Sequence, residues 1–445
     1  METKNSIINE KITARRKLIK SLWKNAHDVL NFIYGDMPEV RILNRFYSEK
    51  MQFGDKDHII LWDLVADIRL KAKENGYLST LSGTDASCLT SYLVGASDSN
   101  PLELHYRCSD CKRTEFLSSS LLPWDIADKP CECGGVMRAD GFDVPYEMHT
   151  PGRGAPWPHI TMASAFMNSV ESIIREKMGG LYRICKLTKP DFEILKFAFL
   201  PFDGEPDFEE DVDTVDSKYD MYPQITIVSP ISYDNAKKLS DASGIDFDEV
   251  RADLEHKYLS DPRIISAFAK ADIGGVLHFD LWRHPHARDL RNELRAANPK
   301  NNYDLLKYFG VMHGTGSWWG NAEVLIKEDT CSIGEIPAHR DDVFMALRDK
   351  LHEAGHTDTG FAFNITTKAR RGVYAREGIA AEDRAVLEYL DLPKWFATYL
   401  EKVQYMSPKS HSVENLRIAL VFMWYKINYP EIFAACIESK LPDEE

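Results

Sequence analysis

The spacing of apolar residues divides the chain into a mixed first half and a helical second half. Apolar positions recur near 3.6-residue spacing over 6–34 and 55–75, which predicts helices there. The runs that predict strands are 158–163, 181–187, 194–200 and 224–229. We therefore expect a helical segment over 1–54, an α+β part over 55–230 and an all-helical part over 231–445.

Helical periodicity continues through almost all of the chain after residue 233. The segments that it predicts as helices are 233–242, 246–257, 262–270, 286–297, 302–309, 318–326, 340–353, 380–390, 393–404 and 411–437. A length of 445 residues is more than one ordinary core accommodates. The fold class is therefore α+β, with two or three domains.

The composition narrows the class of protein. Hydrophobic residues make up 44% and charged residues 28% of the chain, as in an ordinary globular protein. No run of 18 apolar residues predicts a membrane span, and the charged N-terminus is unlike a signal peptide. We expect a cytoplasmic protein with no membrane partner. The net charge of −15 argues against nonspecific duplex binding over the whole surface, and the acidic run 203–220 is typical of a solvated loop.

Four of the eight cysteines form two close pairs about 20 residues apart. Such pairs are typical of a structural zinc site, and Gly134-Gly135 permits a tight turn after the second pair. The second pair has one intervening residue instead of two, so His105 or His149 could replace one thiolate. Four thiolates leave no open position for catalysis. The predicted zinc ligands are Cys108, Cys111, Cys131 and Cys133.

A second group of potential ligands lies in "HFDLWRHPHARD" (278–289). It can be interpreted as a metal site or as the polar start of a helix, and the second interpretation is the simpler one. The residues concerned are His278, Asp280, His284 and His286.

Long ordered motifs then indicate a family. They are "DVPYEMHTPGRGAPWPHI" (143–160), "GVMHGTGSWWGNAEVLIKEDTCSIGEIPAHRDDV" (310–343) and "YMSPKSHS" (405–412), with the cysteine insert before the first. In this order they resemble the polymerase core of the PolC-type DNA polymerase III alpha subunit, a C-family polymerase. The resemblance covers about 38–437. It implies a polymerase-like palm with a zinc insert over about 105–150 and a helical fingers-like domain.

The resemblance also implies where catalytic carboxylates should stand. Family members hold two Mg²⁺ ions with aspartates on two palm strands, and the metals activate the 3′ oxygen and stabilise pyrophosphate. The matching positions carry His159, Thr161 and Thr226. Neutral side chains do not hold Mg²⁺ as carboxylates do. Whether Mg²⁺ binds elsewhere is open, and we predict that this polymerase site is degenerate.

The family's phosphate-binding turn is altered as well. It corresponds to 76–88, where Gly83 remains, Ser82 replaces an arginine and Asp85 adds negative charge. Gly83 and Thr84 could still contact a nucleotide, or the turn could simply cap a helix. In the fingers-like part, Lys409 and His411 match family positions that face the incoming nucleotide.

The interval between the strands at 159–161 and 226 is about half the family's span, which predicts a reduced or absent thumb. We also expect the family's PHP, exonuclease and OB-fold domains to be missing from this chain. Together these departures favour a catalytically inactive, truncated PolC-like protein. Its role would be binding, scaffolding or regulation, with a protein partner or replisome component, in a phage, mobile-element or defence setting.

Two alternatives remain. The first is a nucleotidyltransferase with a rebuilt site, whose carboxylates would come from Asp85, Asp143, Glu147, Asp216 or Asp220. The second is a module that binds nucleic acid or nucleotide through basic residues of the fingers-like part. Those residues are Lys368, Arg370, Arg371, Lys402, Lys409 and His411.

Overall fold

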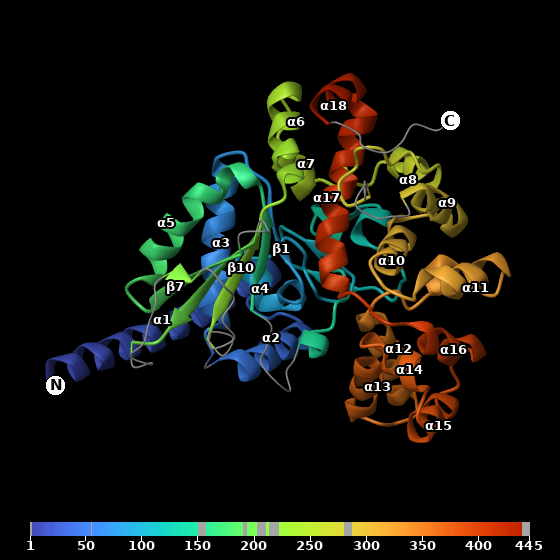
Figure 1. Ribbon diagram of the computed structural model, residues 1–445, viewed down its shortest axis with the longest axis horizontal. Helices are drawn as coiled ribbons and strands as arrows, with labels where there is room; N and C mark the ends of the chain where they lie inside the picture. The colour runs from blue at the N-terminus through green and yellow to red at the C-terminus, as the bar shows by residue number, and fades with distance from the viewer. Residues whose placement is uncertain are drawn as a thin grey trace. The chain divides into compact units, whose positions relative to one another are not determined.

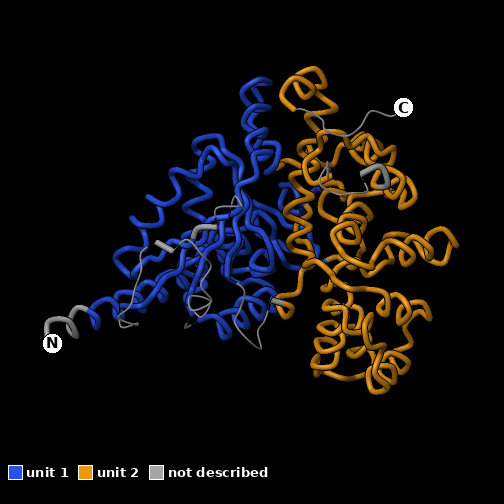
Figure 2. Tube along the Cα trace, in the orientation of Figure 1, with its two compact units in different colours: residues 1–116, 129–138, 149–252 blue, residues 117–128, 139–148, 253–445 orange. Residues whose placement is uncertain are grey.

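The chain forms two compact units, each with its own core (Figure 2). The computed structural model describes residues 2–54, 56–149, 157–189, 194–202, 211–212, 222–279 and 287–437. Unit 1 consists of 1–116, 129–138 and 149–252, and unit 2 of 117–128, 139–148 and 253–445. In the described residues, no helix is both long enough and apolar enough to span a bilayer.

Unit 1 is built on a mixed sheet in the order β1-β6-β10-β8-β7-β9. Its strands are β1 (Ser79–Ser82), β6 (His159–Met162), β7 (Arg183–Lys189), β8 (Ile194–Leu200), β9 (Asp211–Val212) and β10 (Gln224–Val228). β6 and β10 are parallel, whereas β1 pairs with β6, and β8 with β10, in antiparallel fashion. Successive side chains of a strand alternate between its faces, so β1, β6 and β10 give the sheet one apolar and one more polar face, whereas β7 and β8 place a small buried apolar cluster on that second face.

Helices cover the apolar face of this sheet (Figure 1). The helices of unit 1 are α1 (Glu2–Tyr34), α2 (Val40–Phe53), α3 (His58–Glu74), α4 (Leu89–Leu93), α5 (Met167–Met178), α6 (Asn235–Ser243) and α7 (Phe247–Ala252). The core includes Ile160 of β6, Ile227 of β10 and Phe197 of β8. Burial of these alternate residues fixes which strand positions face away from the helices.

A second, four-stranded sheet carries the cysteine pairs, in the order β3-β2-β5-β4. Its strands are β2 (His105–Cys108), β3 (Thr114–Phe116), β4 (Lys129–Pro130) and β5 (Val136–Asp140). The predicted insert is therefore a small antiparallel ribbon whose turns hold the cysteines.

Unit 2 is helical throughout its described residues after 253. Its helices are α8 (Pro262–Ala269), α9 (Ala287–Ala297), α10 (Asn302–Met312), α11 (Glu323–Lys327), α12 (Arg340–Glu353), α13 (Gly360–Arg370), α14 (Val373–Glu377), α15 (Ala381–Tyr389), α16 (Lys394–Lys402), α17 (Lys409–Asn428) and α18 (Pro430–Cys436). α17 is buried along most of its length and forms the centre of the unit. Figure 1 shows α12 to α16 gathered at one end of it.

The predicted strands and most predicted helices are confirmed, one predicted helix is divided, and further elements appear that were not predicted. The single helix expected over 411–437 is interrupted at Tyr429, because Pro430 has no N–H to continue the ladder. β1, α2, α13 and α14 were not predicted. In α2 the charged Glu49 occupies a buried position among apolar residues. This interrupts the apolar periodicity of the helix, so the sequence pattern did not predict it.

Candidate functional site

The positions singled out on the sheet lie together on its polar face. His159 of β6 is in register with Ser82 of β1 on one side and with Thr226 of β10 on the other. Thr226 is in turn opposite Lys196 of β8. Residues in register point to the same face, so a row of four polar side chains crosses the sheet: Ser82, His159, Thr226 and Lys196.

Thr161 lies one step along the same face. It is in register with Thr80, and its Oγ1 is 2.7 Å from Ser82 Oγ. His159 is exposed and Thr161 half-buried, whereas Thr226 is buried. The site is therefore a surface of hydroxyl groups with an imidazole at its centre and a lysine at one end.

The electrostatics of this face oppose a bound cation. Although part of the His159 side chain reaches solvent, neighbouring atoms partly desolvate the imidazole and lower its pKa, and the positive charge of Lys196 lowers it further. A positive charge next to the metal position repels a divalent cation, whereas Mg²⁺ sites require anionic oxygen ligands. Within the described residues, neither Ser82, His159, Thr226 and Lys196 nor the adjoining Thr80 and Thr161 supplies a carboxylate.

The turn after β1 contains Gly83 and Thr84. Gly83 has φ of +79°, a left-handed conformation that suits glycine. Thr84 precedes the one-turn 3₁₀ helix Asp85–Ser87, and its carbonyl accepts a 2.6 Å hydrogen bond from Ser87 Oγ. The turn is therefore closed by Ser87, and the Thr84 side chain makes no capping hydrogen bond to the 3₁₀ helix, contrary to the capping interpretation.

Asp85 points into the core of unit 1 and not to solvent. Its Oδ1 accepts a 2.7 Å hydrogen bond from Trp62 Nε1, and the residue is 1% exposed. Burial raises its pKa to about 7, against the opposing effect of the Trp62 hydrogen bond. A buried carboxyl group with this pKa is a poor metal ligand at neutral pH.

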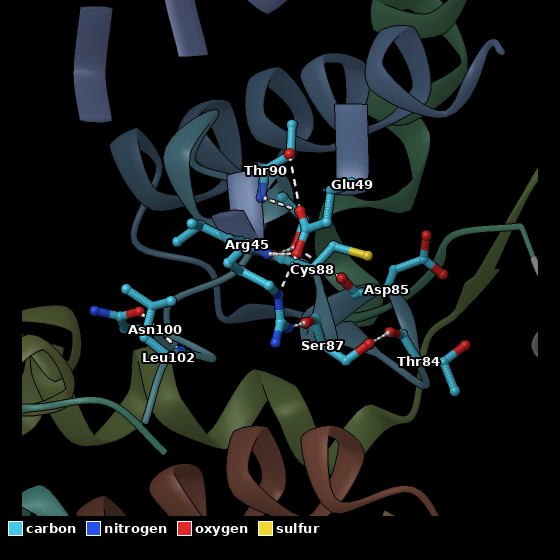
Figure 3. Close-up of polar contacts among 11 residues, drawn as sticks. Arg45, Glu49, Thr84, Asp85, Ser87, Cys88, Thr90, Asn100 and Leu102 are labelled. Atoms are coloured by element: carbon cyan, nitrogen blue, oxygen red, sulfur yellow. Dashed lines mark hydrogen bonds and ion pairs between the residues drawn. The ribbon is translucent and has the colours of Figure 1, made fainter. Parts of the chain in front are cut away.

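The first amides of α4 are occupied by a side chain of the same unit (Figure 3). The Glu49 carboxylate accepts hydrogen bonds from the backbone N–H of Leu89 at 2.8 Å and of Thr90 at 2.9 Å. It also pairs with Arg45 Nε at 2.7 Å. Because a helix N-terminus attracts anions, Glu49 satisfies here the groups that a phosphate would otherwise use.

The four predicted cysteine ligands come together in the ribbon. All four sulfur atoms lie within 4.8 Å of one another, and the pairs Cys108–Cys133 and Cys111–Cys131 are each 3.6 Å apart. A tetrahedral Zn–S distance of about 2.3 Å places thiolates about 3.8 Å apart. The residues therefore fit a structural metal ion such as zinc.

Local backbone geometry supports this cluster. A hydrogen bond from the Cys111 N–H lowers the pKa of Cys108, whereas the pKa values of Cys131 and Cys133 are raised, against the effect of their backbone hydrogen bonds, by neighbouring thiols and by burial, so the tendency to form the thiolate that a metal binds is greatest at Cys108. A side chain at Gly135 would collide with Asp110 and crowd Cys108 Sγ. This close approach explains the glycine after the second pair.

His105, one of the two histidines that could have replaced a thiolate, does not belong to this cluster. His105 is buried, with Nε2 3.2 Å from Tyr34 Oη and Nδ1 2.7 Å from the Glu103 carbonyl. The side chain of His149 lies outside the described residues, as do Asp280, His284 and His286 of the second predicted group. His278 of that group is described, and its pKa is lowered by burial and by the charges of His313 and His411.

In unit 2, the stretches 310–343 and 405–412 contact each other directly. Thr315 and Tyr405 exchange backbone hydrogen bonds, at 3.0 and 3.1 Å. Asp341 accepts the backbone N–H of Lys409 at 2.7 Å. Asp342 pairs with the buried Lys307 at 2.9 Å. These motif residues therefore hold the helices of unit 2 together.

Lys409 is itself part of this packing. It is 4% exposed, and its Nζ donates to the Asp143 carbonyl at 2.9 Å within unit 2. His411 is half-buried, with Nε2 3.0 Å from Asn415 Nδ2. Neither contact requires a nucleotide.

The other basic residues of unit 2 differ in their surroundings. Lys368 pairs with Asp383 at 2.7 Å, and Lys402 donates to the Gly320 carbonyl at 2.7 Å. Arg370 is half-buried, and its pKa is lowered to about 10 by burial and by the charges of Arg340 and Arg371. The three arginines thus form a local cationic cluster.

Comparison with known proteins identifies sequences similar to this chain. No protein-family model matches the chain. It is 23% identical to the PolC-type DNA polymerase III of Lacticaseibacillus paracasei over 92% of its length, and 24% identical to that of Clostridium perfringens over 95%. The chain is similar to PolC-type DNA polymerase III.

The PolC-type polymerase of Thermotoga maritima is also 24% identical, over 96% of the chain. These alignments cover 32% to 36% of the relatives, so the chain spans about a third of the length of the PolC-type proteins that it matches. The resemblance inferred from the motifs is confirmed, and the chain is a divergent PolC-like sequence.

Sequence reasoning did not find Lys196 or Glu49. Lys196 lies in an apolar strand run, and only the register of β8 on β10 places it opposite Thr226. Glu49 is on a helix that was not predicted, 40 residues before the amide of Leu89 that it binds. Neither has a local sequence signal, because both depend on pairing across the fold.

Proposed function

We propose that this protein is a catalytically inactive PolC-like protein that acts as a binding, scaffold or regulatory protein. The observation that carries the proposal is the polar row on the sheet. Its register brings His159, Thr161 and Thr226, the positions at which the resemblance implies metal-binding aspartates, onto one face of the sheet beside the positive charge of Lys196. Two-metal nucleotidyl transfer requires anionic ligands to hold its metals.

The surroundings of the row support the same proposal. The neighbouring turn is closed by its own hydrogen bonds, and Asp85 is turned into the core. The amides of α4 are satisfied by Glu49. The residues that would anchor metal and triphosphate are therefore replaced or already engaged.

The alternative of a rebuilt nucleotidyltransferase has less support. Asp85 is a buried carboxyl group whose pKa is raised by burial to about 7, so a large part of it is protonated, and unable to bind a metal, at neutral pH. Asp143 and Glu147 belong to unit 2, and Asp216 and Asp220 lie outside the described residues. Among the described residues of unit 1, no cluster of three metal-ligating groups other than the cysteine set is present.

A nucleotidyl-transfer assay tests the proposal. We expect no incorporation of dNTPs or NTPs on a primer–template with Mg²⁺ or Mn²⁺. Product formation by the unmodified protein would overturn the inactive assignment. The triple variant His159→Asp/Thr161→Asp/Thr226→Asp should gain Mg²⁺ binding, measured by calorimetry, because it restores the anionic ligands.

The matched control is His159→Asn/Thr161→Asn/Thr226→Asn, which has similar volume without negative charge. We expect no Mg²⁺ binding by this variant. If both triple variants bind Mg²⁺ equally, the metal lies elsewhere and the sheet face is not the degenerate site.

A role in binding nucleic acid or nucleotide is favoured by one observation in unit 2. Arg340 is 7% exposed, and the described carboxylate nearest its guanidinium is Asp341, at 3.8 Å. The charges of Arg340 and Arg371 add to burial in lowering the pKa of Arg370, so positive charge is in excess around Arg370. Arginine guanidinium groups bind phosphates by charge-assisted hydrogen bonds, so a phosphate-bearing partner fits this face.

A further inference from the structure

The exposed face of α1 is strongly basic, although the protein as a whole is acidic. Arg16, Lys17, Lys20 and Lys24 are exposed, and we call these four residues the basic stripe. At 100° per residue they fall within about 100° of the helix circumference. The chain has a net charge of −15, so this surface differs in sign from the molecule that carries it.

The opposite face of α1 explains why the stripe points outward. Ile19, Trp23 and Leu30 are buried in the core of unit 1. Arg15, beside the stripe, pairs with Asp57 at 2.8 Å and is thereby used for structure. Among the described residues, no carboxylate lies within ion-pair distance of the basic stripe. Among the described residues of α1, the exposed carboxylates Glu10 and Asp28 lie about 20° beyond Lys17 around the helix, and Asp28 is one turn after Lys24.

Exposed aromatic residues lie near the C-terminal end of this surface, where Asp28 separates Lys24 from Phe32 along the helix. Phe32, two turns after Lys24, is 75% exposed, and Lys112 Nζ lies 4.9 Å from the centre of its ring. Tyr47 of α2 is 46% exposed and contacts His27 of α1, with Oη 3.5 Å from Nε2. From Arg16 to Phe32 the helix rises about 24 Å. Figure 1 shows α1 as the long helix at the edge of unit 1.

A row of cations beside exposed aromatic rings fits single-stranded nucleic acid. Cationic side chains follow the phosphates, and unpaired bases stack on aromatic rings. A duplex keeps its bases stacked inside and gains nothing from Phe32. An acidic protein segment would use the charges without needing the ring.

We propose that the basic stripe, with Phe32, is a binding surface for single-stranded nucleic acid. This surface lies in unit 1, outside the polar row of the sheet and outside the arginine cluster. The inference rests on the binding role proposed above and specifies single-stranded nucleic acid as the class of partner. Failure of this inference would leave the expected absence of nucleotidyl transfer untouched.

Fluorescence anisotropy of the full-length protein with a labelled thymidine oligonucleotide of about 20 nucleotides tests the surface. Binding to single strands follows salt with a slope of about −0.7 per neutralised phosphate. Four contacts therefore predict about 50-fold weaker binding at 200 mM than at 50 mM salt. The variant Lys20→Gln/Lys24→Gln should reduce this loss to about sevenfold.

The matched control is Lys71→Gln/Lys73→Gln, which removes two exposed lysines from α3 of the same unit. It should keep the affinity and the salt slope of the unmodified protein. If both double variants lose affinity equally, binding follows net charge and the proposed surface is wrong.

Phe32→Ala separates stacking from charge. We expect about tenfold weaker binding from the loss of one stacked base, with an unchanged salt slope. Unchanged affinity would remove Phe32 from the site. Equally tight binding of a duplex of the same length would overturn the single-strand assignment, and equal competition by poly-glutamate would indicate an acidic protein partner instead.

Discussion

Two buried carboxyl groups of unit 1 have different surroundings. Glu49 is 0% exposed and is balanced by Arg45 and by the amides of α4. Asp85 is 1% exposed and contacts Trp62, and burial raises its pKa to about 7. A carboxyl group whose pKa is raised in the folded state is accommodated there in its neutral form. As the pH rises and the group ionises, the folded state loses stability relative to the unfolded state.

We therefore predict that Asp85 makes unit 1 less stable as the pH rises. Its folded pKa of about 7 exceeds the unfolded value, so the folded state binds more protons between about pH 4 and 7. Asp85→Asn should remove this dependence and raise the free energy of unfolding at pH 8 by about 2–4 kcal/mol. Urea denaturation at pH 5 and pH 8 measures the effect.

The exposed Asp36 provides the control, since Asp36→Asn should leave the pH dependence unchanged. An Asp85→Asn protein whose stability falls between pH 5 and pH 8 as steeply as that of the unmodified protein would show that Asp85 is already ionised in the fold.

At the level of elements, short segments acquire their structure from distant partners. The ribbon strands β2 to β5 have between two and five residues each, too few to be stable alone. The sulfur atoms of Cys108, Cys111, Cys131 and Cys133 lie within 4.8 Å of one another in the turns of this ribbon. A metal ion at that point would connect the two halves of the ribbon directly.

We predict that the purified protein contains about one zinc ion, held by this ribbon. Cys111→Ser/Cys133→Ser should lose the metal, and the ribbon should become susceptible to proteolysis, because metal binding supplies folding free energy. Elemental analysis and limited proteolysis give the two readouts. Cys436→Ser, outside the cluster, is the control and should retain the metal. Full zinc content in the double variant would exclude the cluster as the site.

At the level of the whole molecule, the chain contains two units with separate buried ion pairs. Glu49 with Arg45 belongs to unit 1, and Asp342 with Lys307 belongs to unit 2. Removing one partner of a buried pair leaves an uncompensated charge, at a cost of about 3–5 kcal/mol. Large chains often open unit by unit.

We therefore predict unit-specific effects in hydrogen exchange followed by mass spectrometry. Asp342→Asn should increase exchange in peptides from α12 and α17, and Glu49→Gln in peptides from α4 and β1. Glu39→Gln, at an exposed ion pair, should change neither. Increased exchange throughout the chain in both buried-pair variants would mean that the two units unfold as one.

The sequence by itself determined the strands 194–200 and 224–229, the major helices, the cysteine pairs and the PolC-like resemblance. These features are local or ordered along the chain, so periodicity and spacing record them. The sequence also placed a histidine and two threonines at positions where the resemblance implies aspartates.

Only the tertiary structure decided what surrounds those positions. The register of β8 on β10 placed Lys196 opposite Thr226, and the packing of α2 brought Glu49 to the amides of α4. Burial turned Asp85 toward Trp62. The physical reason is common to all three: strand register and helix packing bring together residues far apart in the chain, and no local pattern encodes those pairings.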